Sequence, residues 1–126
     1  MKKLVIIFLL LSSTTCWGKW TFVVENKNGN EFFVDLDNIK RVGNSLYVWE
    51  LQNFDKPFLG RFSAVTYTEF NCDTFGFRYL EMIVYKEKLA TGDMKKIPLE
   101  QEQREWQFTP PSSSNYRVTK FVCSYN

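Results

Sequence analysis

The sequence predicts an α+β domain in which a mainly antiparallel β-sheet of about five to six strands carries a C-terminal α-helix. Apolar and polar residues alternate with a period of two over most of the chain, and turn-forming residues interrupt the alternation at short intervals. Near the C-terminus the apolar spacing changes to that of a helix. Cys72 ends a predicted strand and Cys123 lies in the predicted helix, so a disulfide between them would tie the helix to the sheet.

The first residues have the order of a secretory signal. Lys2 and Lys3 form a positive start, residues 4–11 are an unbroken apolar run, and small or short polar residues follow. This run is far shorter than the roughly 20 residues that a membrane-spanning helix needs. We therefore expect residues 1–18 to be a signal peptide, residues 19–126 to be a single exported domain, and no transmembrane helix.

Cys16 lies at the signal junction and leaves two interpretations of the cleavage site. In one, Cys16 becomes the lipidated first residue of an outer-membrane lipoprotein, although Ser13-Thr14-Thr15 departs from the usual lipobox. In the other, which the small residues favour, signal peptidase cuts after Gly18 and removes Cys16. The choice decides whether the domain is anchored to a membrane or released from it.

Two alternating segments near the mature start predict a β-hairpin. Residues 20–25 and 31–36 each carry apolar side chains at every second position, and the Asn-Gly-Asn of residues 28–30 is a strong turn signal between them. Residues 37–39 predict a short turn, and residues 43–44 predict the next one.

Three longer segments predict the centre of the sheet. Residues 45–54 alternate, and Asp55-Lys56-Pro57 is expected to end that strand because proline cannot donate to a ladder. Residues 61–72 and 77–88 follow. The first of the three strands has Tyr47, Trp49 and Leu51 on one face and Glu50 and Gln52 on the other. The last has Leu80, Met82 and Val84 opposite Tyr79, Ile83 and Tyr85, so we expect a central strand that is covered on both faces.

The remaining residues predict weaker structure and then the helix. Residues 91–93 predict a turn, residues 94–103 an exposed loop or frayed edge, and residues 106–108 a short strand. Two prolines at 110–111 stop any strand, and several candidate N-caps follow. Residues 116–125 then predict a terminal helix whose apolar stripe consists of Val118, Phe121, Val122 and Tyr125.

Cysteine usage agrees with export. With Cys16 set aside, two cysteines remain, and an even pair in an exported chain predicts a disulfide. A Cys72–Cys123 bridge closes a loop of about 50 residues, which the chain-entropy model values at around 3–4 kcal/mol. The alternative is two unrelated buried thiols.

The composition argues against several kinds of function. The chain has no histidine, which is the commonest general base and metal ligand. Two separated cysteines without histidine do not make an ordinary zinc site, and no glycine-rich phosphate loop is present. Removal of Lys2 and Lys3 takes the net charge from +2 to zero, which does not suit a nucleic-acid binder. The sequence therefore predicts a non-enzymatic protein with no metal or other cofactor and no nucleic-acid partner.

Three weaker candidates have a functional and a structural interpretation. Asp35 and Asp37 could serve acid–base chemistry or bind calcium, but a solvated strand end is favoured. The lysines within residues 86–96 could form a basic rim, but they alternate with acidic residues, so a solvated surface is favoured. Trp49 and Trp106 could form a binding platform, but packing in the core is favoured.

Short landmarks follow one another in a characteristic order along nearly the whole mature chain. They are Trp20, residues 33–35 with Ile39, Val48-Trp49, residues 69–72, residues 78–80 with Tyr85, Gly92, Trp106, residues 110–113 and residues 121–123. The ordered set, with its two cysteines, resembles the surface-adhesin protein E family of Gram-negative bacteria. This resemblance implies a small antiparallel sheet with a disulfide-tied C-terminal helix. It also implies an adhesin that binds host extracellular-matrix proteins and can form homodimers, and it carries over no ligand-binding residue.

The residues and the resemblance together lead to one functional expectation. We expect an exported, non-enzymatic binding protein of the bacterial envelope or surface, with a protein as its partner. The alternative is a periplasmic structural or stress-related envelope protein whose ligand the sequence does not identify.

Overall fold

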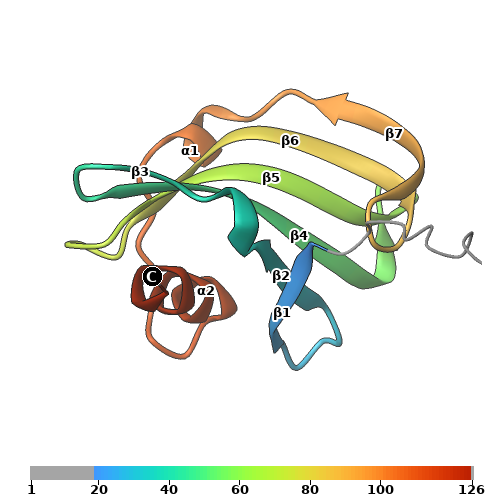
Figure 1. Ribbon diagram of the computed structural model, residues 1–126. Coiled ribbons are helices and arrows are strands. Elements are labelled where there is room, and N and C mark those ends of the chain that lie inside the picture. Colours follow the sequence, from blue (N-terminus) through green and yellow to red (C-terminus); the bar gives the residue numbers. More distant parts are fainter. Residues whose placement is uncertain (1–18, 126) are drawn as a thin grey trace, which may run out of the picture.

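An antiparallel sheet forms the centre of the structure, which is a computed structural model that describes residues 19–125 (Figure 1). Within these residues seven strands pair in the order β1-β2-β4-β5-β6-β7, and β3 pairs with β4 beside β2. The strands are β1 (Trp20–Glu25), β2 (Glu31–Asp35), β3 (Lys40–Val42), β4 (Ser45–Phe58), β5 (Arg61–Asn71), β6 (Phe77–Glu87) and β7 (Thr91–Ile97). The helices are the short 3₁₀ helix η2 (Leu36–Asn38), α1 (Gln101–Arg104) and α2 (Ser114–Ser124). The predicted fold class is confirmed.

The hairpin and the terminal helix form where the sequence predicts them. β1 and β2 pair antiparallel around residues 26–30, and Gly29 adopts a positive φ of 85° in the turn. Ser113 is the N-cap of α2, because its hydroxyl accepts a hydrogen bond from the Tyr116 backbone N–H at 3.1 Å. The N-terminal signal and Cys16 lie outside the described residues.

Two predicted boundaries in the sheet are wrong. β4 does not end at Asp55 but continues through Pro57 to Phe58. The β4–β5 register is irregular between Asn53 and Phe58, so the missing N–H of Pro57 does not interrupt a regular ladder. Likewise residues 91–93 are not a turn but begin β7, because the chain already reverses at residues 88–90. Leu89 and Ala90 adopt positive φ values of 59° and 56° in that reversal.

The segment after β6 differs from the prediction in two places. The edge strand β7 ends at Ile97, and α1 follows where a loop or frayed edge is expected. In place of a strand at residues 106–108, Gln107 alone forms an isolated bridge with Phe77. Both differences lie beside β6, where the chain turns back toward α2.

A bulge in β6 reverses the alternation of side chains between the two faces of the sheet at that point in the strand. Tyr67 pairs with Glu81 but Thr68 pairs with Tyr79, so Leu80 is an extra residue in the ladder. Tyr79 therefore joins Met82 on one face, contrary to the predicted alternation.

The main hydrophobic core lies between α2 and one face of the sheet. Val118 and Val122 of α2 are buried against Val34, Leu46, Val48, Phe70 and Phe77 of the sheet. Figure 1 shows α2 on this side, next to β1 and β2. α2 contacts β1 and β2, and the short α1 contacts β6 toward the other side of the sheet.

The predicted disulfide between Cys72 and Cys123 is present. Their Cα atoms are 5.6 Å apart, a separation usual for a disulfide, and the bridge spans 51 positions of the sequence. Cys72 follows β5 and Cys123 lies near the end of α2, so the bridge joins the helix to the sheet beside the core. None of the helices within residues 19–125 has the length and apolar character to cross a membrane.

Candidate functional site

Asp35 and Asp37 form a turn. The Asp35 carboxylate accepts hydrogen bonds from the Asp37 backbone N–H at 3.1 Å and from the Asn38 side-chain amide at 2.9 Å. Asp35 is thus the N-cap of η2, which explains the close pair of acidic residues as a strand end entering a turn. Residues 19–125 contain no group of three or more His, Cys, Asp or Glu side chains that could hold a metal ion.

The lysines within residues 86–96 form a solvated surface, as the sequence favours. Lys86, Lys88 and Lys95 are exposed. Lys96 forms an ion pair with Glu81 of the neighbouring strand at 3.0 Å, and this pair is exposed enough to contribute little to stability. These side chains therefore lie on the solvent-exposed β6–β7 side of the sheet.

The sheet face opposite α2 carries a row of aromatic side chains, which we call the open face. In the part of the chain that the structure describes, neither α1 nor α2 lies over it. Trp49 and Tyr67 pair across β4 and β5, and their ring centroids are 4.7 Å apart. Phe22 and Phe33 form an edge-to-face pair at 5.6 Å farther along the same face. Tyr47, whose ring lies 6.2 Å from that of Tyr67, completes the row.

Beside this row, the open face carries a charged cluster. Arg78 donates to the Glu69 carboxylate at 2.8 and 2.9 Å, and its guanidinium lies 4.5 Å from the Trp106 ring centroid. Burial acts to raise the pKa of Glu69, but hydrogen bonds from Ser45 and Arg78 and the Arg78 charge outweigh it, so its pKa is lowered. The favoured placement of Trp49 and Trp106 in the core is therefore wrong, because both lie on the open face and are partly exposed.

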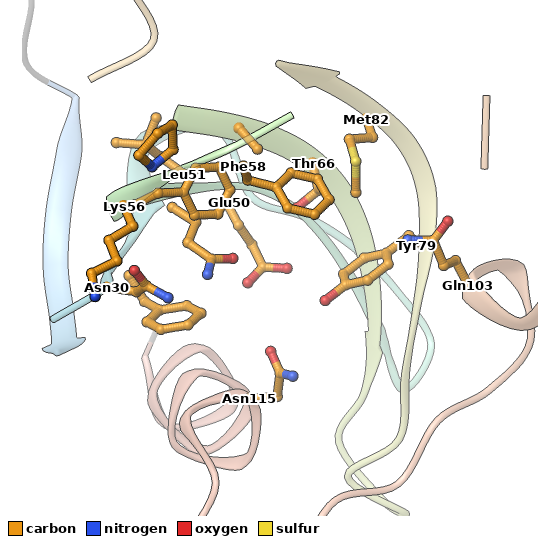
Figure 2. Close-up of a pocket in the computed structure, with 15 residues that line it drawn as sticks. Asn30, Glu50, Leu51, Lys56, Phe58, Thr66, Tyr79, Met82, Gln103 and Asn115 are labelled. Carbon is orange, nitrogen blue, oxygen red and sulfur yellow. The ribbon is translucent and has the colours of Figure 1, made fainter. Parts of the chain in front are cut away.

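On the other face lies a cavity of about 440 Å³, between the sheet, α1 and α2 (Figure 2). Its polar side chains include Glu50 of β4, Thr66 of β5, Tyr79 of β6 and Asn115 of α2. Its apolar walls include Phe32, Phe54, Phe58 and Met82. In Figure 2 the carboxylate of Glu50 and the hydroxyl of Tyr79 point into the same space.

Glu50 is the one carboxylic acid among the residues that line this cavity. Its side chain accepts a hydrogen bond from the Thr68 hydroxyl at 2.5 Å. Burial raises the pKa of Glu50 to about 7, against the lowering effect of hydrogen bonds from Thr68 and Thr66. Burial also raises the pKa of Tyr79, and the nearby charge of Glu50 adds to that effect, so the phenol is neutral at physiological pH.

Sequence reasoning missed Glu50 and Tyr79. Alternation placed Glu50 opposite Tyr47, Trp49 and Leu51, and those apolar residues looked like the buried face. The helix instead covers the face of Leu46 and Val48, which also contains Glu50. The sequence contained one signal that Glu50 is buried. Leu46 and Val48 are apolar and alternate in step with Glu50, so all three side chains lie on the same face of β4.

A family model described as surface-adhesin protein E matches residues 20–124. No match was found among curated protein sequences.

Several solved structures have a similar fold. A structure of Haemophilus influenzae protein E has a TM-score of 0.64 at 16% identity, covering 84% of each chain. A second crystal form of that protein has a TM-score of 0.65 at 15% identity, covering 84% of this chain and 87% of that one. Protein E from non-typeable Haemophilus influenzae has a TM-score of 0.65 at 16% identity, covering 88% of this chain and 79% of that one. At such identities the likeness establishes a shared fold.

Proposed function

This chain belongs to the surface-adhesin protein E family, and we propose that it is an exported, non-enzymatic binding protein of the bacterial envelope or surface. Its partner in this proposal is another protein, in the first place a host extracellular-matrix protein. Family membership supports a role in adhesion, and the signal-like residues 1–18 support export.

The observation that carries the proposal is the aromatic row on the open face. Tyr, Trp and Phe are enriched at protein interfaces, and Trp and Tyr are frequent binding hot spots. The rings of Trp49 and Tyr67 already pack against each other, and the two residues belong to paired strands, so binding would immobilise few additional rotamers. The Arg78–Trp106 pair lies at the side of the row and adds a charged group with a defined position.

One end of the open face is closed, which limits where a partner can dock. The turn at residues 88–90 folds back onto it, and the Leu89 backbone N–H donates to the Asn53 side chain at 2.8 Å. Leu51 and Val65 are buried in the neighbouring part of this face. The proposed docking surface is therefore the part around Tyr47, Trp49 and Tyr67.

Surface plasmon resonance on immobilised laminin and vitronectin tests this proposal. We expect the mature protein, with its disulfide intact, to bind at least one of them at micromolar concentration. A Trp49→Ala variant is expected to lose about tenfold or more in affinity, as for a hot spot. Tyr125→Ala is the matched control, because Tyr125 is an exposed aromatic residue just after α2. Absence of binding at micromolar concentration, or equal effects of the two substitutions, would contradict the proposal.

A second candidate is a periplasmic structural or stress-related envelope protein. The departure of Ser13-Thr14-Thr15 from the usual lipobox favours it, since a released domain needs no lipid on Cys16. Protease treatment of intact cells separates the two candidates. Digestion supports surface display, and protection supports a periplasmic role. The intact mass of the mature protein identifies the cleavage site and any lipid on Cys16.

A further inference from the structure

We propose that the cavity on the helix-covered face is a binding site for a small organic cation. The carboxylate of Glu50 pairs with the positively charged ammonium group of the cation, and the aromatic and aliphatic walls receive its hydrocarbon part. This site is separate from the open face, so it goes beyond the proposed adhesion.

The first argument is that Glu50 is buried without a compensating charge. Its exposed fraction is 8%, and its polar neighbours in the structure, Thr66 and Thr68, are neutral hydroxyls. Among residues 19–125 no Lys or Arg forms an ion pair with it. A buried carboxylate needs a charge partner to stay ionised at low energetic cost. A ligand cation supplies that partner, whereas the carboxylate disfavours an anion.

The second argument is the way in which the strands assemble the walls. Glu50, Thr66 and Met82 are consecutive partners across β4, β5 and β6, so they lie in one row of the same face. The bulge at Leu80 adds Tyr79 to that face. The same bulge is therefore the local feature that gives the cavity both its phenol and part of its aromatic wall.

The third argument is the chemical match between walls and ligand. Phe32 and Phe58 line the cavity together with Tyr79, and aromatic faces attract organic cations. Asn115 of α2 lies below the carboxylate in Figure 2 and offers one more hydrogen-bonding group. The volume of about 440 Å³ falls within the usual range for small-molecule sites, roughly 300–1,000 Å³.

Binding of a cation to this site is coupled to the ionisation of Glu50. Two other titratable groups line the cavity: Tyr79 from β6, which is neutral, and Lys56 from β4, which is exposed. Gln103 from α1 and Asn115 from α2 carry no charge. A ligand that needs ionised Glu50 therefore binds about thirtyfold more tightly at pH 8 than at pH 5.5, given a pKa of about 7.

NMR titration of the isotope-labelled mature protein tests the proposal with three probes: benzylamine, phenethylamine and choline. The neutral control ligand is 2-phenylethanol. We expect at least one cation to shift the amide signals of Glu50, Thr66 and Tyr79, and the alcohol to bind at least tenfold more weakly. Glu50→Gln should reduce the cation's affinity tenfold or more, whereas Glu25→Gln, at an exposed site on β1, should not.

Calorimetry on the unmodified protein gives an independent measurement. In buffers with different ionisation enthalpies, cation binding at pH 6.5 should release about three quarters of a proton. The proposal is overturned if none of the three cations binds at millimolar concentration, or if the alcohol binds equally well. It is also overturned if Glu50→Gln leaves the affinity unchanged, or if no proton is released.

Discussion

Glu50→Gln is expected to remove a pH-dependent loss of stability from this protein. The amide cannot ionise, yet its oxygen can still accept the hydrogen bond from the Thr68 hydroxyl. The substitution therefore changes the charge of the buried group while it preserves the shape and the main polar contact.

The sign of the effect follows from the two pKa values. Burial raises the pKa of Glu50 from 4.5 to about 7, so the folded protein holds a proton that the unfolded chain releases. The carboxyl group's contribution to stability is fully present below pH 4.5 and is lost as the pH rises through 7. A pKa difference of about 2.5 corresponds to about 3 kcal/mol, most of which is lost between pH 5 and pH 8.

Urea denaturation of both proteins at pH 5 and pH 8, with the disulfide intact, measures this effect. The free energy of unfolding of the wild type should fall by about 2 to 3 kcal/mol more than that of Glu50→Gln over this interval. Glu25→Gln, which alters an exposed carboxyl group, should follow the wild type. Parallel pH profiles for wild type and Glu50→Gln would refute the reasoning, because they would show that Glu50 has the same pKa in the folded and unfolded states.

Three further predictions concern the core, the disulfide and one turn. Replacing Cys72 and Cys123 together by alanine should lower the free energy of unfolding by about 3–4 kcal/mol in urea, and a loss below about 1 kcal/mol would contradict the loop-closure argument. Val122→Ala should cost about 2 kcal/mol by the same assay, because Val122 is fully buried, whereas Lys120→Ala on the exposed side of α2 should cost little. Gly29→Ala should cost about 1–2 kcal/mol, because Gly29 has a φ of 85° and an added Cβ would lie 3.2 Å from Asp55, and an unchanged thermal midpoint would refute this.

Most of the strands could be predicted from local pattern, because alternation and turn residues act over a few positions. The β1–β2 hairpin and α2 agree with the sequence, and so does the disulfide that joins α2 to the end of β5. The errors occur where long-range pairing overrides a local preference. Pro57 stays within β4 because the ladder is already irregular there, and residues 91–93 join a strand because the chain reverses three residues earlier.

The cavity could not be predicted, because it depends on which face of β4 the helix covers. Both faces of that strand carry apolar residues: Leu46 and Val48 on one, Tyr47 and Trp49 on the other. Alternation separates the two sets but does not say which set is buried. α2 docks on the face of Leu46 and Val48. Glu50 on that face is therefore buried, and Trp49 on the opposite face stays partly exposed.

The sequence by itself determined the class of fold, the terminal helix and the cysteine pair, since each depends on the spacing of residues along the chain. It also contained the ordered landmarks of the surface-adhesin protein E family. Tertiary structure alone decided the positions of Tyr79 and Glu50. A single extra residue in β6 moves Tyr79 to the other face, and a helix more than 60 positions later in the chain covers Glu50's side of the sheet. Both decisions depend on contacts between distant segments, which local periodicity does not encode.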